Sequence, residues 1–182
     1  MKHSLKKVFL LAALLFALLP CNASCQATWH PVTYNISFKI KNAGIAVSGK
    51  FSDLKTELVF SPDKLATSKL SGSVVPATLK TGINMRDNHI KEESYLDAEK
   101  FKLIEITSLK LYPQGTGYAG LFRITIKGVS KEMEIPFDFI QFGDQADFNA
   151  SFTINRRDFN VGGSSMTMAD NVAVSIKIKA RN

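Results

Sequence analysis

Apolar and polar residues alternate with a period of two along most of the chain beyond residue 33. In residues 34–41, for example, Ile36, Phe38 and Ile40 fall on one face and polar residues on the other. This alternation is typical of an antiparallel strand that buries one face. It predicts strands over residues 34–41, 45–51, 54–60, 70–79, 103–111, 118–127, 132–140, 148–154 and 171–179.

Short turns separate the predicted strands, and glycine lies in residues 42–44, 113–115, 127–128 and 143–144. Eight strands, or nine if residues 45–51 and 54–60 do not form one long bent strand, predict an all-β antiparallel barrel or sandwich. Pro136 lies in the middle of one predicted strand and lacks an N–H donor. We therefore expect a bulge or a broken pairing at that residue.

Residues 80–101 interrupt the alternation. They are rich in charge, and residues 84–100 carry the best helical signal beyond the N-terminus. We expect a short helical insert that acts as a lid or recognition element. Arg86, Asp87 and His89 lie together in it and are assigned to the mouth of the fold. A hydrogen-bonded ion cluster that holds the insert is the favoured role, and contact with a ligand head group is the alternative.

The N-terminus predicts export. Lys2, Lys6 and Lys7 precede an apolar run of 12 residues, 8–19, which Pro20 ends. A run of this length is too short for a transmembrane helix and, with its basic start, is typical of a secretory signal peptide. We assign residues 1–27 to that peptide.

Ala23 and Ala27 are the two expected cleavage positions, because small residues stand where a signal peptidase requires them. Lipid anchoring at Cys21 or Cys25 is the less favoured alternative, since the residues around both cysteines fit a lipoprotein signal poorly. Removal of the peptide leaves 155 residues, 28–182, enough for one domain with one core. We expect this domain to be periplasmic or secreted.

The exported domain is only mildly basic. The whole sequence has a net charge of +7, and Lys2, Lys6 and Lys7 account for three of these charges. The remaining Lys and Arg are scattered among acids, which argues against nucleic-acid binding. Both cysteines lie at or before Cys25, so the domain has at most one thiol, with neither an internal disulfide nor a cysteine metal site.

Phenylalanine is the commonest aromatic residue of the domain, with 11 Phe against a single Trp. Because its ring has no polar atom, it suits either a packed core, which composition alone favours, or the wall of a hydrocarbon pocket. The residues that share the apolar face of their strands are expected to point inward and to line a ligand-binding lumen. They are Phe38, Ile40, Phe51, Phe60, Ile104, Ile106, Phe122, Ile124, Ile126, Ile135, Phe137, Phe152, Ile154, Val174 and Ile176.

Catalysis has little support in the sequence. His30 and His89 are the histidines of the domain, and nothing has the spacing of a zinc-binding HExxH motif. Arg156 and Arg157 stand beside Asp158 and are expected to form a surface ion pair in a turn rather than a phosphate site. We therefore expect no catalytic residue, no metal and no cofactor.

Several motifs resemble the YceI family. The letters TG at 81–82, RDNHI at 86–90 and YLDAEKF at 95–101 follow one another as in that family, and ITIKGVSK at 124–131 and RDF at 157–159 resemble two later elements. The similarity runs from about residue 33 to residue 180. It implies a lipocalin-like antiparallel barrel, exported to the periplasm, with a polyisoprenoid chain in its lumen.

Two positions depart from the family pattern. Tyr34 and Asn35 stand where the family usually has His-Ser, and Phe122 stands where Gly is common, which narrows the expected lumen. The resulting hypothesis is an exported, non-enzymatic protein that holds a long isoprenoid, a quinone or a polyprenol, for carriage or sequestration. A barrel enzyme acting on a bound lipid and a filled barrel acting through a protein partner are the alternatives. Transient membrane contact and a dimer are left open.

The strand count also locates the expected entrance. Connections in an up-and-down barrel alternate between its two ends, so residues 84–96, 127–131 and 160–169 should share one end. Residues 112–117 and 141–147 should lie at the other. Because the longer connections fall at the first end, we expect the mouth there, covered by 84–96 and 160–169, with the second segment the more mobile.

Overall fold

The computed structural model of this protein describes residues 26–182. Residues 1–25, which contain most of the predicted signal peptide, both cysteines and the cleavage position after Ala23, lie outside the described part. Among residues 26–182, no helix is long and apolar enough to cross a bilayer.

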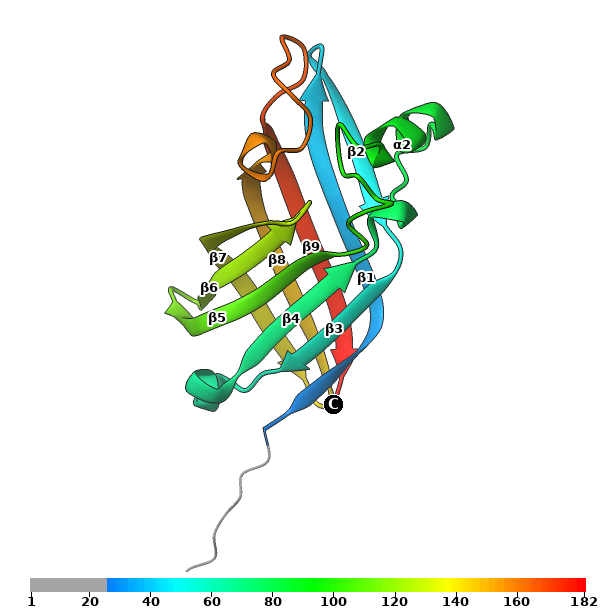
Figure 1. Cartoon of the computed structure of the whole chain (residues 1–182). Coiled ribbons are helices and arrows are strands. Elements are labelled where there is room, and N and C mark those ends of the chain that lie inside the picture. The colour runs from blue at the N-terminus through cyan, green and yellow to red at the C-terminus, as the bar shows by residue number, and fades with distance from the viewer. Residues whose placement is uncertain (1–25) are drawn as a thin grey trace, which may run out of the picture.

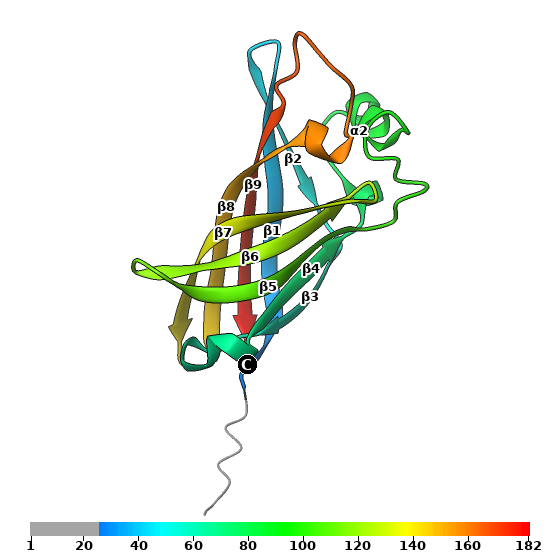
Figure 2. The same ribbon diagram turned by 60° about the vertical axis from the view of Figure 1, so that its left-hand side comes forward.

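The structure confirms the predicted all-β antiparallel barrel (Figures 1 and 2). Strands make up more than half of residues 28–182, and helices less than a fifth. The strands are β1 (Thr28–Asn42), β2 (Ile45–Phe51), β3 (Leu54–Val59), β4 (Lys69–Val74), β5 (Ile104–Gln114), β6 (Gly117–Ile126), β7 (Val129–Phe142), β8 (Gln145–Asn155) and β9 (Asn171–Arg181). Eight of them close into a ring through the pairing of β1 with β9, and β2 is the extra strand.

β1 is long enough to pair with three strands. Its first residues pair with β3, at Thr28 and Trp29, and its later part pairs with β9 on one edge and β2 on the other. Residues 45–51 and 54–59 are therefore two strands rather than one bent strand, because they pair with opposite ends of β1. The β1–β2 hairpin extends beyond the ring, as Figure 1 shows.

Proline explains the end of one strand and the limit of one strand pairing. β4 ends at Val74 rather than at Leu79, because Pro76 begins a short 3-10 helix, η3 (Pro76–Thr78). At Pro136 the pairing of β7 with β6 continues without a bulge. The pairing of β7 with β8 starts only at Phe137, so the predicted broken pairing lies on that side.

The helical segments are short. Within the predicted insert, α2 covers Asn84–Lys91, and residues 92–100 form turns instead of continuing the helix. The turns bury Leu96 and Ala98, which helical spacing would place on different faces. Two further 3-10 helices, η2 (Pro62–Thr67) and η4 (Arg156–Phe159), were not expected from the alternation pattern.

A cluster of aromatic rings closes one end of the barrel. Phe60 is completely buried and packs at 4.7–6.0 Å, centroid to centroid, from four of its neighbours. The indole Nε1 of Trp29 donates a hydrogen bond to the carbonyl oxygen of Phe60 at 3.0 Å. We call this group the aromatic plug: Trp29, Phe60, Tyr118, Phe137, Phe139 and Phe148.

The longer connections meet at the other end, as the strand count predicts. The amide of Gly162 donates to the carbonyl oxygen of Ser94 at 2.9 Å, which joins the loop before β9 to the insert. Lys127, in the β6–β7 turn, donates to the carbonyl oxygens of Glu93 and Asn160 at 2.7 and 3.1 Å. These contacts unite the three segments in one cap over the barrel, opposite the aromatic plug.

Candidate ligand-binding cavity

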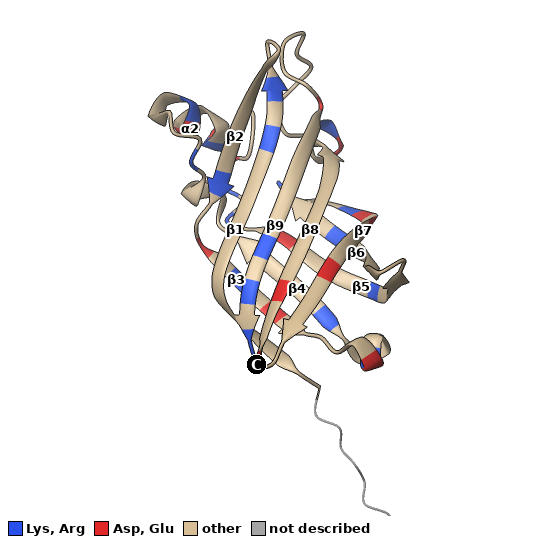
Figure 3. Ribbon diagram, turned by 180° about the vertical axis from the view of Figure 1, so that it is seen from behind, with Lys and Arg blue, Asp and Glu red and all other residues tan. Residues whose placement is uncertain are grey.

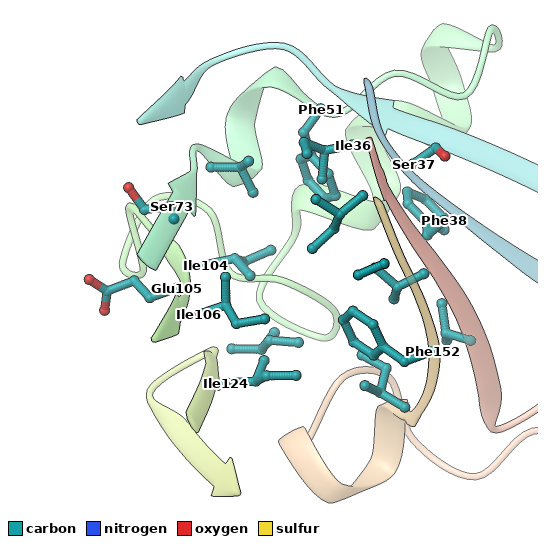
Figure 4. Close-up of a pocket in the computed structure, with 18 of the residues that line it drawn as sticks. Ile36, Ser37, Phe38, Phe51, Ser73, Ile104, Glu105, Ile106, Ile124 and Phe152 are labelled. Carbon is teal, nitrogen blue, oxygen red and sulfur yellow. The ribbon is translucent and has the colours of Figure 1, made fainter. Parts of the chain in front are cut away.

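An apolar cavity of about 280 Å³ lies between the aromatic plug and this cap. Its wall is formed by the inward faces of strands around the ring, and side chains from the cap complete it. Figure 4 shows Ile104, Ile106 and Ile124 on one side of the space and Phe38 and Phe152 on the other. The wall offers almost no polar surface.

Fourteen of the fifteen residues predicted to face the lumen lie along this wall. They are Phe38, Ile40, Phe51, Ile104, Ile106, Phe122, Ile124, Ile126, Ile135, Phe137, Phe152, Ile154, Val174 and Ile176. The exception is Phe60, which points inward but lies in the plug below the cavity. That these residues contact a ligand stays a prediction.

Other residues of the wall are absent from the predicted set for two reasons. Ile36, Leu58 and Leu70 share the strand parity of the predicted set and could have been included by extending it to every strand. Leu79, Leu96 and Phe159 lie outside the strands of the structure, Leu79 because β4 ends at Val74, so a period of two does not determine where their side chains point. All three are buried, at 1%, 7% and 2% exposure, and they form the ceiling of the cavity.

The polar residues next to the cavity contribute little to its surface. Figure 4 shows the side chains of Ser73 and Glu105 on the outer side of the wall, pointing away from the space. Thr56 Oγ1 is buried and has no hydrogen-bond partner among the described residues. The wall therefore presents almost only hydrocarbon to any occupant.

Arg86, Asp87 and His89 do not line the cavity. Arg86 donates from Nε to Thr81 Oγ1 at 2.8 Å and from Nη2 to the Thr81 carbonyl oxygen at 3.0 Å. Asp87 Oδ1 accepts from the amide and the hydroxyl of Thr81 at 2.7 and 2.5 Å. Thr81 thus links the two residues and fixes the start of α2. His89 lies apart from them, on the exposed side of the insert, where Nδ1 is 3.0 Å from Glu92.

Asp87 is buried, at 1% exposure, and its carboxylate is held ionised by these contacts. The hydrogen bond from the Thr81 hydroxyl lowers the pKa of Asp87, burial opposes that shift, and the Thr81 amide and Lys80 add to it. Lys80 Nζ is 4.0 Å from Oδ2, which has no hydrogen-bond partner among the described residues. The arrangement supports a structural role for Asp87 in the insert.

Arg156 is buried at 3% exposure, which contradicts the expectation of a surface ion pair. Its Nη1 donates to the carbonyl oxygens of Val161, Gly162 and Gly163 at 2.9–3.0 Å. Nε donates to Ala169 at 3.0 Å, and Nη2 donates to Asp170. The guanidinium is occupied by the protein's own acceptors, so it holds the loop before β9 in place and is not free for a phosphate.

Among the described residues, no three His, Cys, Asp or Glu side chains gather closely enough to hold a metal ion. The described residues enclose an apolar cavity that the aromatic plug closes at one end and the cap covers at the other. Hydrogen bonds between the insert and the loop before β9 hold the cap together.

Comparison with known proteins finds related sequences and related structures. The chain is 27% identical over 135 residues to a UPF0312 protein of Vibrio vulnificus strain YJ016, covering 70% of this chain and 71% of the relative. The crystal structure of BcnA from Burkholderia cenocepacia superposes with a TM-score of 0.77 at 22% identity, covering 80% of this chain and 95% of BcnA.

A polyisoprenoid binding domain from Saccharophagus degradans, implicated in plant cell wall breakdown, superposes with a TM-score of 0.65 at 10% identity. The match covers 85% of this chain and 97% of that domain, and it shows a shared fold. The sequence profile of the YceI-like domain matches residues 28–180, which is nearly the whole described barrel. The chain therefore belongs to the family of YceI-like domain proteins.

Proposed function

We propose that this protein is exported and binds the hydrocarbon chain of one isoprenoid, a quinone or a polyprenol, in the cavity of its barrel. The observation that carries the proposal is the cavity itself, a space of about 280 Å³ with an almost entirely apolar wall and one end closed by the aromatic plug. Such a wall favours a chain of carbon atoms over a polar ligand, because a polar group inside would lose its hydrogen bonds with water.

The likeness to the Saccharophagus degradans polyisoprenoid binding domain supports the ligand class. The N-terminal basic residues followed by an apolar run support export and a periplasmic or secreted location. Transfer of the chain from water contributes about 0.8 kcal/mol for each CH2 group, before the cost of ordering the chain.

The volume limits how much of the chain can enter. A cavity of about 150 Å³ holds one benzene molecule of six carbons, so 280 Å³ accommodates roughly twice that number, or about two isoprene units. A longer chain must extend past the cap, through the segments 84–96 and 160–169. The head group then lies outside the wall or at the cap, which fits carriage or sequestration better than chemistry.

The two alternatives fit the cavity less well. A barrel enzyme acting on a bound lipid needs polar groups that converge on the reacting atoms, and this wall offers almost none. A barrel that works only through a protein partner needs no internal cavity, whereas the interior of this barrel is not completely filled by side chains. Binding without chemistry is therefore the function that the geometry favours.

Native mass spectrometry of the purified protein, followed by lipid extraction and identification, tests the proposal. We expect a bound isoprenoid from cells, and saturable uptake of farnesol by the lipid-free protein at one molecule per barrel. The proposal would be contradicted if the protein were recovered without lipid and also took up no geraniol, farnesol or geranylgeraniol in solution.

A further inference from the structure

Ile45 and Met166 expose large apolar side chains at the capped end of the molecule. Ile45 is 71% exposed, and Met166 is fully exposed. They are distant in sequence, yet backbone hydrogen bonds join their segments: Ala43 N donates to the Thr167 oxygen at 2.8 Å, and Ala169 N donates to the Lys41 oxygen at 2.9 Å. The two segments, residues 41–45 and 165–169, form one structure that we call the tip.

The apolar surface of the tip continues into the cavity. Ile40 pairs with Val47 across the β1–β2 hairpin, and Ile45 is two residues from Val47, so all three share the inward face. Ile40 lines the cavity, as does Met168, which forms an isolated bridge with Asn42 at the tip. A hydrocarbon surface therefore leads from the wall of the cavity to the exposed end of the hairpin.

The tip and the residues that lead into it carry only positive charge. Residues 36–51 and 160–169 contain Lys39, Lys41 and Lys50, and no Asp or Glu. Figure 3 shows basic residues and no acidic ones on the β1–β2 hairpin. Lys39 and Lys41 flank Ile40, so they lie on the outward face, opposite the apolar one. Asp170, which follows the second segment, is paired with Arg156 at 2.8 Å.

The plugged end of the barrel provides a contrast. Ile140 and Phe142 are also exposed there, at 48% and 67%. The ten residues 138–147 around them contain three Asp and neither Lys nor Arg. Asp144 and Asp147 are paired with Arg181 at 3.2 Å and Lys179 at 3.0 Å, so the basic side chains nearest to Ile140 and Phe142 are neutralised. An anionic surface would therefore attract the tip more strongly than the plugged end, although both ends expose apolar side chains.

We propose that the tip docks on an anionic lipid bilayer, with Ile45 and Met166 inserted among the head groups and Lys39 and Lys41 beside the lipid phosphates. Apolar side chains next to lysines are the combination that binds such a surface. The physiological purpose rests on the proposed function, since a bilayer is where an isoprenoid chain resides. Docking by the tip places the hydrocarbon path of the hairpin against the membrane, so a chain can pass between bilayer and cavity.

Co-sedimentation with isoprenoid-free vesicles tests the docking. We expect the purified protein to bind vesicles that contain one quarter phosphatidylglycerol in phosphatidylcholine, and to bind pure phosphatidylcholine much more weakly. Ile45→Ser with Met166→Ser should lower the partition coefficient by about tenfold or more. Lys39→Gln with Lys41→Gln should lower it by about tenfold at low salt. The matched pairs Ile140→Ser with Phe142→Ser, and Lys177→Gln with Lys179→Gln, should leave it within about twofold.

Farnesol uptake in solution, measured for the same variants, separates this proposal from the proposed function. None of the substituted residues Ile45, Met166, Lys39 and Lys41 lines the cavity, so all variants should still take up farnesol. Equal loss of vesicle binding in the tip and control pairs, or no binding to anionic vesicles by the unaltered protein, would overturn the docking proposal. A third outcome would also overturn it. If the protein did not bind vesicles but formed a dimer that the Ile45→Ser and Met166→Ser pair dissociated, the occupant of the tip would be a second copy of the chain.

Discussion

Arg156 Nη2 donates a hydrogen bond to Asp170 Oδ1 at 2.8 Å, across the base of the loop that precedes β9. The rest of the guanidinium is bound by carbonyl oxygens of the loop itself. A buried charge is stabilised here mainly by main-chain acceptors, so one side chain fixes the shape of the whole segment. The loop carries Val161 and Met168, which are parts of the cavity wall.

Replacing Arg156 by Met should release this loop. The carbonyl oxygens of Val161, Gly162 and Gly163 would lose their donor, and we expect the free energy of unfolding to fall by about 2–4 kcal/mol. Hydrogen exchange should accelerate in residues 161–169 more than in the strands. Arg157→Met is the matched control: its side chain is 51% exposed and lies 3.7 Å from Asp170, so its effect should be below about 1 kcal/mol. Equal effects of the two substitutions would contradict the assigned role.

A carboxylate in the wall should prevent uptake of a hydrocarbon chain. Phe152 points into the cavity in Figure 4, and its neighbour Ser151 is exposed on the outside of the barrel. Phe152→Asp should weaken farnesol binding by at least about 30-fold, because the chain would have to displace water from an unpaired charge. Ile126→Asp should behave alike, and Ser151→Asp should bind farnesol normally. Phe152→Ser adds no charge, so it should fold even if the Asp variant does not. It should bind farnesol with an affinity between those of the unaltered protein and the Asp variant.

Affinity should depend on chain length up to the volume of the cavity. Each five-carbon unit adds gross burial of roughly 3–4 kcal/mol, partly offset by ordering. We therefore expect affinity to rise from one to about two isoprene units and to level off beyond about three. Competition among prenyl alcohols of increasing length measures this directly. A strong dependence on the head group with equal binding of short and long chains would favour the enzyme alternative.

Phe122 should set part of this limit. It lines the cavity and packs on Phe137 of the plug, with ring centroids 6.3 Å apart. Phe122→Ala should enlarge the cavity by about the volume of a benzene ring and extend the preferred chain by about one unit. It should cost about 3–5 kcal/mol of stability. Phe139→Ala is the control, because Phe139 belongs to the plug but not to the wall, and it should leave the preferred length unchanged.

The strands and most of the cavity wall could be predicted from sequence, because one physical rule governs both. Residues such as Phe38 and Ile124 alternate with polar neighbours, and a period of two determines which face they share. The rule does not say how far along the barrel a residue lies, so it predicts a lumen position for Phe60, which lies in the plug.

The cap was harder to predict than the barrel. Leu96 lies in a turn and Phe159 ends the 3-10 helix η4. Arg156 is buried because six acceptors of a folded-back loop surround it. These contacts arise from tertiary structure, and nothing in the local sequence distinguishes Arg156 from the exposed Arg157 next to it. The motif RDNHI in the insert predicts one cluster of Arg86, Asp87 and His89, whereas the structure joins Arg86 and Asp87 to Thr81 and His89 to Glu92.

The contribution of Asp87 to stability should depend on pH. The Thr81 hydroxyl lowers the pKa of Asp87 in the folded protein, so the folded state binds a proton less readily than the unfolded state. The stabilisation is therefore complete above the unfolded pKa of about 4 and is lost as the pH falls through the lower folded value. Asp87→Asn lacks this titration, so the gap in unfolding free energy between the unaltered protein and the variant should be constant from neutral pH to about pH 5 and shrink below it. Urea unfolding at a series of pH values measures the gap, with the exposed Asp53→Asn as control. A gap that stays constant down to about pH 2 would show that Asp87 acts through its shape alone and not through its charge.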